Sequence, residues 1–211
     1  NTGAEVIGIT GSNGKTIVKE WLSQLLAPDF RVHRSPGSFN SQVGVPLSLL
    51  GMHPEDEIAI IEAGISQRGE MRKLEAMIRP EIGIFTHLGE AHEENFSSPE
   101  EKLMEKSKLF TDCKVIICKA GIISDFLHKQ FPDTTLLIWS EQPGYDLCVE
   151  TSFLNNKTRE ICVTCNDCTY KLTLPFTDQA SLENIMHVLC YLRYKNIPSE
   201  IIQQRIPGLT A

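Results

Sequence analysis

Residues 6–16 read VIGITGSNGKT and join a short apolar run to a glycine-rich turn that closes on Gly-Lys-Thr. The apolar residues 6–9 predict a buried parallel strand, and residues 17–26 predict an amphipathic helix behind it. Glycines between a strand and a helix let backbone N–H groups converge on an anion at the positive helix start. Lys15 can then reach the β- and γ-phosphates, and the Thr16 hydroxyl can bind the accompanying Mg²⁺. The stretch therefore predicts a nucleotide-phosphate site.

The spacing of this turn departs from the usual Gly-x4-Gly-Lys-Ser/Thr pattern, because Ile9 stands where that pattern has its first glycine. A generic glycine-rich turn is the alternative interpretation. However, residues 8–16, GITGSNGKT, resemble the ATP loop of the Mur ligases, the amide-forming synthetases of peptidoglycan precursor assembly. The resemblance implies an ATP-binding set made of Thr10, Gly11, Ser12, Asn13, Gly14, Lys15 and Thr16.

Length and composition fit one α/β domain over residues 1–211. The chain is 41% hydrophobic, which argues against disorder. Its net charge of −7 disfavours a nucleic-acid partner, which would need a basic face. No apolar run approaches the roughly 20 residues that span a bilayer, and no basic, apolar leader precedes the first strand. The chain begins at Asn1 and ends just after a Pro-Gly turn, so we expect a piece of a longer protein.

Strand and helix candidates alternate over the first 140 residues. This alternation predicts βαβ crossovers and a mostly parallel phosphate-loop sheet flanked by helices on both faces. The subregion of about 146–175 has consecutive strand candidates with turn residues between them, which predicts a small antiparallel meander at the sheet's edge. Two closing helices are predicted at 181–194 and 199–205. The earlier strands are predicted at 6–10, 58–63, 82–86, 115–118 and 136–139, and the helices at 17–26, 43–50, 71–78, 99–110 and 124–131.

The seven cysteines are an odd number without secretory context, which predicts reduced thiols in a cytosolic protein. The run Cys162-x2-Cys165-x2-Cys168 is also compatible with an iron–sulfur or zinc cluster. Residues 166–167, Asn-Asp, lie between two strand candidates and indicate a two-residue hairpin turn instead. The pattern therefore favours structural cysteines in a small sheet.

Glu62 follows the continuous apolar run of residues 58–61, which suits a strand buried on both faces. Ligands of open α/β sheets bind beyond the carboxyl ends of the strands. An acid there can hold Mg²⁺ opposite the phosphate loop, although a strand-end acid that faces solvent is equally consistent with the spacing. The Mur ligases carry a magnesium-binding glutamate in the same Glu-x-Gly setting, so the resemblance implies a metal role for Glu62.

Residues 86–96, THLGEAHEENF, follow another strand candidate and place histidines and carboxylates on the same side of the sheet. A solvated loop histidine is the alternative to any functional role. The segment resembles the Mur ligase pattern Asn-x4-His-x-(Asp/Glu)-x-(Phe/Tyr), which implies a metal-binding, catalytic role for His92 and puts Glu94 at the acidic position. His87 stands where the family usually has asparagine, and its role is left open.

Helix 99–110 carries Lys102, Lys106 and Lys108 among several glutamates. Charge pattern alone predicts a solvated face with i,i+4 pairs. Mur ligases carry a lysine in this helix, four residues before an aromatic, whose amine is carbamylated and becomes a carboxylate-like metal ligand. Lys106, four residues before Phe110, matches that register. The resemblance therefore implies a catalytic Lys106 that, once carbamylated, helps to bind a second Mg²⁺ together with His92.

Residues 35–47, SPGSFNSQVGVPL, resemble the substrate block of one branch of the family, the ligases that join D-alanyl-D-alanine to UDP-N-acetylmuramoyl-tripeptide. A plain loop before a helix is the alternative. Two serines replace asparagines of the block, which affects their polar contacts. The matching positions are Asn40, Gly44 and Pro46. The resemblance implies substrate contacts at Ser38, Asn40 and Ser41.

Residues 181–184, SLEN, occupy the place of the family's Asn-x-x-Asn motif, whose second asparagine contacts adenine. Only that second asparagine, Asn184, is retained. The resemblance implies that it binds ATP, and a buried amide at a helix start is the alternative.

Taken over residues 6–205, the resemblance implies an ATP-dependent amide ligase of the bacterial cytoplasm that uses two Mg²⁺ ions and an acyl-phosphate intermediate. The family's enzymes have flanking domains that bring UDP-N-acetylmuramoyl-tripeptide and D-alanyl-D-alanine, so the central domain alone is expected not to ligate. No nucleic-acid or membrane partner is implied. Two alternatives stay open: another ligase of the superfamily, such as folylpolyglutamate synthase or a different Mur ligase, and a non-catalytic nucleotide-binding module.

Overall fold

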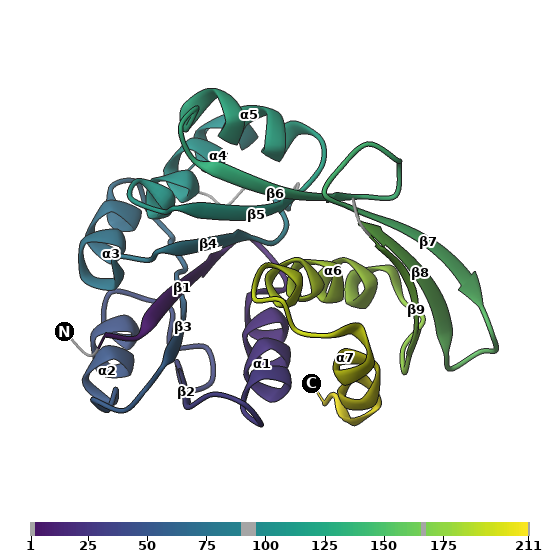
Figure 1. The fold of residues 1–211 in the computed structure, drawn as a ribbon. Coiled ribbons are helices and arrows are strands. Elements are labelled where there is room, and N and C mark those ends of the chain that lie inside the picture. The colour runs from purple at the N-terminus through teal and green to yellow at the C-terminus, as the bar shows by residue number, and fades with distance from the viewer. Residues whose placement is uncertain (1–2, 90–95, 166–167, 211) are drawn as a thin grey trace.

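The computed structural model describes residues 3–89, 96–165 and 168–210, and within them one nine-stranded sheet with the order β2-β3-β1-β4-β5-β6-β7-β8-β9 (Figure 1). Neighbouring strands from β2 to β7 run parallel, and β7, β8 and β9 pair antiparallel. The strands are β1 (Glu5–Thr10), β2 (Val32–Arg34), β3 (Ile58–Glu62), β4 (Ile82–Phe85), β5 (Val115–Lys119), β6 (Thr135–Ser140), β7 (Leu147–Phe153), β8 (Arg159–Cys165) and β9 (Cys168–Leu174).

Helices cover both faces of the parallel part of the sheet, and each layer buries its own apolar cluster. Helices α1, α6 and α7 pack on one face, while α2, α3, α4 and α5 pack on the other (Figure 1). Their bounds are α1 (Lys15–Leu26), α2 (Gly44–Leu50), α3 (Glu70–Ile78), α4 (Pro99–Ser107), α5 (Ile122–Gln130), α6 (Gln179–Tyr194) and α7 (Ser199–Arg205), with 3-10 turns at Lys108–Phe110 and Ile206–Gly208.

Helix α1 owes its position to an apolar stripe with helical spacing. Val18, Trp21, Leu22, Leu25 and Leu26 are buried, and their spacing of three and four residues places them on one side of the helix, facing the sheet. The central strands are apolar on both faces, and all five residues of β3 are buried between the two helical layers. Sequence periodicity therefore sets which helix face meets the sheet.

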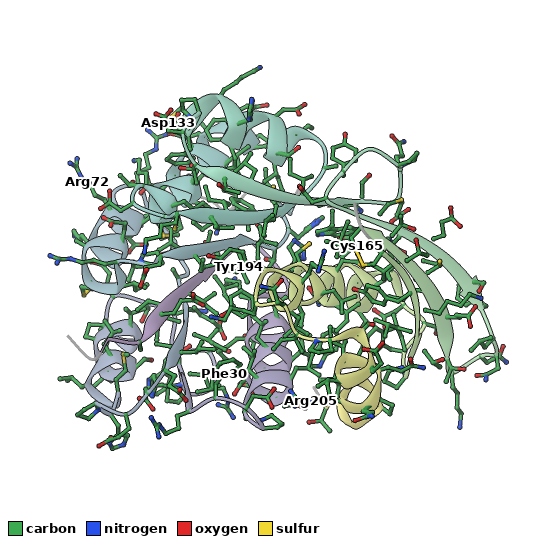
Figure 2. The ribbon with its side chains drawn as sticks, in the orientation of Figure 1. Phe30, Arg72, Asp133, Cys165, Tyr194 and Arg205 are labelled. Carbon is green, nitrogen blue, oxygen red and sulfur yellow. A yellow bond between two sulfur atoms is a disulfide. The ribbon has the colours of Figure 1, made fainter. Side chains whose placement is uncertain are left out.

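The C-terminal helix is tied to the end of α1 by charge-assisted hydrogen bonds. Arg205, labelled in Figure 2, donates to Asp29 through both terminal nitrogens, at 2.6 Å and 2.9 Å, and to the carbonyl of Leu25 at 2.7 Å. The pairing holds the pKa of the Asp29 carboxyl below its usual value, because the guanidinium hydrogen bonds outweigh partial desolvation. These bonds fix α7 beside α1 on the face opposite α3.

The register of the parallel strands brings the functional loops to one edge. Ile9 of β1 lies opposite Glu62 of β3, and Thr10 lies opposite Phe85 of β4. The turn after β1, the carboxylate that ends β3 and the residues after β4 therefore meet at the carboxyl ends of adjacent strands, where open α/β sheets bind ligands.

The predicted fold class is confirmed, including the antiparallel edge, and the predicted strands and helices agree with the structure to within a few residues. Strand β2 was not predicted, because its three residues are too few to establish an alternating pattern. The helix predicted at 99–110 consists of α4 and the 3-10 turn Lys108–Phe110.

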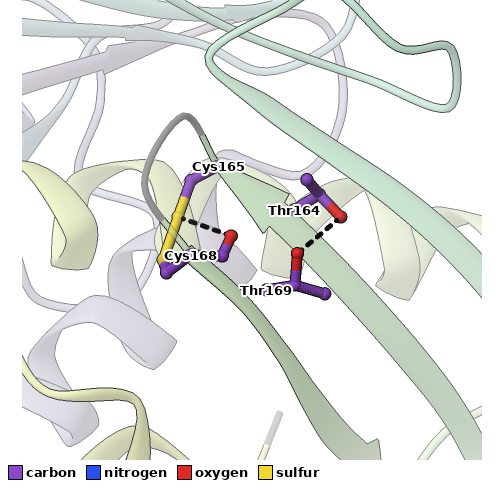
Figure 3. The surroundings of a disulfide bond; sticks show 4 residues. All are labelled: Thr164, Cys165, Cys168 and Thr169. Atoms are coloured by element: carbon purple, nitrogen blue, oxygen red, sulfur yellow. Dashed lines mark hydrogen bonds between the residues drawn. A yellow bond between two sulfur atoms is a disulfide. The ribbon is translucent and has the colours of Figure 1, made fainter.

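The prediction of reduced thiols is wrong for one pair, because Cys165 and Cys168 form a disulfide (Figure 3). They end β8 and begin β9 directly opposite each other, with 5.3 Å between their Cα atoms, which lies in the range that a disulfide bridges. Cys162 lies three residues before Cys165 and so points to the other face of β8, which separates it from the pair. The free thiols are those of Cys113, Cys118, Cys148, Cys162 and Cys190.

The turn predicted at 166–167 lies outside the described residues. Beside the disulfide, the ladder continues with Thr164 and Thr169, whose hydroxyl oxygens are 3.3 Å apart (Figure 3). Among the described residues, no helix has the length and apolar character that crossing a membrane requires.

Candidate nucleotide and metal site

The glycine-rich turn between β1 and α1 is closed by contacts that only glycine permits. Gly11 has φ +142° and Gly14 has φ +84°, which are conformations that side chains disfavour. A Cβ added to Gly11 would lie 2.1 Å from Thr86 Oγ1, and one added to Gly14 would lie 2.2 Å from Asn184 Oδ1. The loop is thus held between the residue after β4 and the first turns of α6.

Backbone bonds to the loop after β4 fix the same turn. The N–H of Ser12 donates to the carbonyl of His87 at 2.6 Å, and Asn13 forms an isolated bridge with His87. The hydroxyl of Thr86 lies 2.6 Å from the carbonyl of Asn13 and donates to it. The backbone of His87 therefore supports the loop, while its ring lies 3.7 Å from Glu183.

The start of helix α1 faces the turn without a capping side chain. Gly14 occupies the N-cap position and so makes no side-chain cap bond, whereas Ser98 caps α4 and Asp178 caps α6. The first N–H groups of α1 consequently keep their capacity to bind an anion, which the helix dipole favours.

Lys15 folds over the turn, with Nζ 3.0 Å from the carbonyl oxygen of Gly11 and 3.3 Å from that of Ser12. Ser12 Oγ is buried and has no hydrogen-bond partner among the described residues. Both side chains border a cavity of about 290 Å³ beside the turn. An ammonium, an orphaned hydroxyl and uncapped N–H groups form a donor set that fits a phosphate.

Glu62 is fully buried at the end of β3, so the interpretation of a solvent-facing acid is wrong. Its Oε2 accepts hydrogen bonds from the Thr16 hydroxyl at 3.2 Å and from the Asn40 amide at 3.4 Å. Its Oε1 lies 2.9 Å from the ammonium of Lys19, which the sequence did not indicate as a site residue. Hydroxyl and carboxylate oxygens are ligands that Mg²⁺ prefers, so Thr16 and Glu62 fit a magnesium ion.

Three charged residues of α4 are buried, contrary to the predicted solvated face: Lys102, Glu105 and Lys106. Lys106 Nζ donates to the carbonyl of Gly11 at 3.3 Å and lines the same cavity as Lys15. Glu105 accepts a hydrogen bond from the N–H of Gly69 at 2.7 Å. Of the three lysines, Lys108, in the 3-10 turn after α4, has the exposed side chain, 43% accessible, and it pairs with Glu105. The face of α4 that carries Lys102 and Lys106 is therefore buried, with Lys106 against the phosphate loop, while Glu100 and Met104 face water.

Two of the three predicted substrate residues reach the cavity. Asn40 and Ser41 line it, and the carbonyl of Asn40 accepts from the N–H of Gly64 at 2.8 Å. Ser38 is exposed and is not among the lining residues. The predicted residues His92 and Glu94 lie outside the described residues.

Gln42 and Glu70 also line the cavity and were missed, because they are ordinary polar residues of a loop and a helix start. Burial acts to raise the pKa of the Glu70 carboxyl, but hydrogen bonds from Ser66, Gln67 and Gln42 outweigh it, so the pKa lies below its usual value. Glu70 is therefore ionised and ties Gln42 to the start of α3, at 2.9 Å.

Asn184 lies in the first turns of α6, and its side chain packs against Gly14 of the phosphate loop. The next turn of that helix is anchored by His187, whose Nδ1 lies 2.7 Å from the carbonyl of Glu183 and whose ring packs edge-on against Trp139. Complete burial lowers the pKa of His187 to about 4, so the ring is neutral at pH 7. This packing places Asn184 beside the phosphate loop.

A mostly parallel sheet with a glycine-rich turn between β1 and α1 defines the class of phosphate-loop α/β domains. Within that class, a model of the Mur ligase middle domain matches residues 9–192. The chain belongs to the Mur ligase middle-domain family.

Curated relatives support this membership. The chain is 30% identical over 202 residues to the UDP-N-acetylmuramoyl-tripeptide--D-alanyl-D-alanine ligase of Treponema pallidum, a match that covers 94% of this chain and 42% of that protein. It is 41% identical over 98 residues to the enzyme of the same name from Bacillus subtilis, covering 46% of this chain and 21% of that one. The chain thus spans less than half the length of these relatives.

Solved structures agree with the fold. MurF ligase from Thermotoga maritima in complex with ADP superposes with a TM-score of 0.86 at 25% identity, over 99% of this chain and 49% of that one. MurF from Acinetobacter baumannii gives a TM-score of 0.90 at 21% identity, over 100% of this chain and 47% of that one, which supports the fold alone.

Proposed function

We propose that this chain is the ATP-binding central domain of a ligase that joins D-alanyl-D-alanine to UDP-N-acetylmuramoyl-tripeptide. One observation carries the proposal. The loop whose donors fit a phosphate lies next to the buried Thr16–Glu62 pair, at the carboxyl ends of the parallel strands. The names of the relatives support the substrates, as does Asn40 of the substrate block, which contacts Glu62.

In this proposal the loop N–H groups and Lys15 hold the β- and γ-phosphates, and Asn184 contacts the adenine. Thr16 and Glu62 hold one Mg²⁺, while His92 and carbamylated Lys106 hold a second. Ions held by these residues would supply positive charge that offsets the charge of the phosphates. Asn40 and Ser41 face the tripeptide, whose terminal carboxylate takes the γ-phosphoryl group of ATP with ADP as the leaving group and becomes an acyl phosphate. The amine of D-alanyl-D-alanine then attacks, and phosphate leaves.

The protein's own groups contribute mainly by positioning and by charge. Lys15 and Lys106 reach the same carbonyl, that of Gly11, from two elements, so both side chains converge on the cavity. Donors fixed before the reaction stabilise charge on a transferring phosphoryl group without reorganising. Flanking domains would bring the two peptide substrates, and the cytoplasm would supply the ATP.

A substrate panel tests this function on the full-length protein. We expect phosphate release that depends on both UDP-N-acetylmuramoyl-tripeptide and D-alanyl-D-alanine, with a product mass equal to their sum less one water. Free diamino acids with the dipeptide precursor, and glutamate with a folate, serve as competing pairs. Activity with either competing pair alone would assign the chain to another branch of the superfamily. Nucleotide binding without turnover on any pair would indicate a non-catalytic module.

Residues 1–211 alone are expected to bind Mg-ATP and not to ligate. Ligation requires both substrates to be held at about 3–3.5 Å from one another, and we assign that task to the flanking domains. The same phosphate-release assay on the isolated chain measures this. Release that depends on D-alanyl-D-alanine would show that the 211 residues suffice.

A further inference from the structure

Lys19 is a fully buried ammonium in the second turn of α1. Its Nζ lies 2.9 Å from Glu62 Oε1 and 3.2 Å from a carboxylate oxygen of Glu20. It also donates to the carbonyl of Ser35 at 2.8 Å and to that of Gly37. A charge without solvent is costly unless such partners surround it. Four partners from three segments of the chain therefore hold Lys19 in one place.

This arrangement orients the carboxylate of Glu62. One oxygen, Oε1, forms an ion pair with Lys19 at 2.9 Å and accepts no hydrogen bond from the described residues, while Oε2 accepts from the Thr16 hydroxyl, 3.2 Å away. A carboxylate bound at only one oxygen can rotate, whereas one held at both oxygens presents a fixed edge. Lys19 and Thr16 are three residues apart on α1 and so lie on the same side of the helix.

The same ammonium fixes the start of the block that leads to the cavity. The hydroxyl of Ser35 accepts from the N–H of Glu62 at 3.3 Å, while the carbonyl of Ser35 accepts from Lys19. The block continues to Asn40, whose amide donates to Glu62 Oε2 at 3.4 Å. Lys19 therefore connects the phosphate-loop helix, strand β3 and the substrate block through one group.

We propose that Lys19 is a positioning residue of the metal site: it holds Glu62 Oε1 so that Oε2 and the Thr16 hydroxyl face the same metal ion. This inference rests on the proposed nucleotide function and adds a residue to it. Lys19 acts through Glu62 and does not itself touch the nucleotide. Groups that orient a metal ligand typically change metal affinity by about 10–100-fold when they are removed.

The test compares ADP binding with Mg²⁺ and with EDTA by titration calorimetry. The proteins are wild type, Lys19→Met, Glu62→Gln and the double variant, with Lys129→Met as a control for the same substitution on the exposed face of α5. In Lys19→Met we expect the gain in ADP affinity that Mg²⁺ provides to fall about tenfold. Affinity in EDTA should stay within about twofold of wild type, because the phosphate loop is untouched.

The double variant separates positioning from mere packing. If Lys19 acts through Glu62, adding Lys19→Met to Glu62→Gln changes the gain in ADP affinity that Mg²⁺ provides by less than about twofold, because the effects of substitutions at contacting residues are not additive. Thermal unfolding first establishes that each variant folds. The shorter Lys19→Gln, which can still donate to Ser35, takes the place of Lys19→Met if that variant does not fold.

Equal losses of ADP affinity in Mg²⁺ and in EDTA, or additive effects in the double variant, would reduce Lys19 to a structural ion pair and overturn the inference. A wild-type chain that binds no ADP would overturn the proposed function together with this inference. The two failures are thus distinguishable by the wild-type titration.

Discussion

Replacing Lys106 by alanine is expected to reduce ligation by the full-length protein about 10²–10³-fold, the scale reported for losing one group that stabilises transition-state charge. Lys106 is buried and its Nζ reaches the carbonyl of Gly11. A protonated lysine repels Mg²⁺, whereas a carbamate presents the oxygen ligands that hard cations prefer. Steady-state kinetics with saturating ATP and both peptide substrates measure the loss.

Lys108→Ala is the matched control, because Lys108 lies two residues further on, has a side chain that is 43% exposed, pairs with Glu105 and is not among the residues that line the cavity. It should keep near-normal activity. Lys102 carries the same charge but is buried, so replacing it would also disturb packing and it is a poorer control than Lys108. Short carboxylates added to Lys106→Ala should restore part of the rate by occupying the vacated oxygen positions. Equal losses at Lys106 and Lys108, or no loss at Lys106, would contradict the metal-ligand role.

Replacing Lys15 by alanine is expected to weaken Mg-ATP binding to this chain by about 2–3 kcal/mol, the cost of losing a charge-assisted phosphate contact. Lys15 Nζ lies over the loop, 3.0 Å from the carbonyl of Gly11, and lines the cavity beside the turn. Titration calorimetry of wild type and variant gives the two affinities.

The control for Lys15→Ala is Lys129→Ala on α5, which removes the same charge far from the turn and should leave affinity unchanged. Thermal unfolding of both variants checks that the fold survives. Equal affinities of wild type and Lys15→Ala would remove the phosphate role from this loop.

The sequence predicted those parts of the fold and site that depend on neighbouring residues in the chain. The phosphate loop follows from an apolar strand, three glycines and Gly-Lys-Thr in one short stretch. The position of Glu62 at a strand end follows from the continuous apolar run before it, but the spacing left open whether its side chain faces solvent, and its metal role was implied by the family resemblance alone. In both cases the strand's carboxyl end fixes the position of the residue, because parallel strands bring these ends together.

Residues whose roles depend on distant partners were not predictable in the same way. Lys19 lies on an amphipathic helix, where a charged residue ordinarily faces water, and its partners come from β3 and the block after β2. The burial of Lys102 and Lys106 likewise depends on α4 packing over the loop, which the charge pattern of one helix cannot reveal. Family resemblance predicted a metal-ligand role for Lys106 from its register with Phe110, and that role stays a prediction; the structure places Lys106 Nζ against the carbonyl of Gly11.

The arrangement of the antiparallel edge was predictable, but its sulfur chemistry was not. Strand alternation and the turn residues at 166–167 predict a hairpin. Whether the residues that flank the turn are directly opposite depends on the register, and here the register places Cys165 against Cys168. The prediction of reduced thiols came from the compartment and not from geometry, and it was wrong for this pair.

A crystal structure of this chain with ADP and Mn²⁺ would show whether Thr16 and Glu62 hold the metal beside the nucleotide, because Mn²⁺ takes oxygen ligands as Mg²⁺ does and its anomalous scattering locates it. We expect an anomalous peak between Thr16 Oγ1 and Glu62 Oε2, with the β-phosphate on the N–H groups at the start of α1. Nucleotide density elsewhere on the molecule, with the loop of residues 11–14 empty, would contradict it.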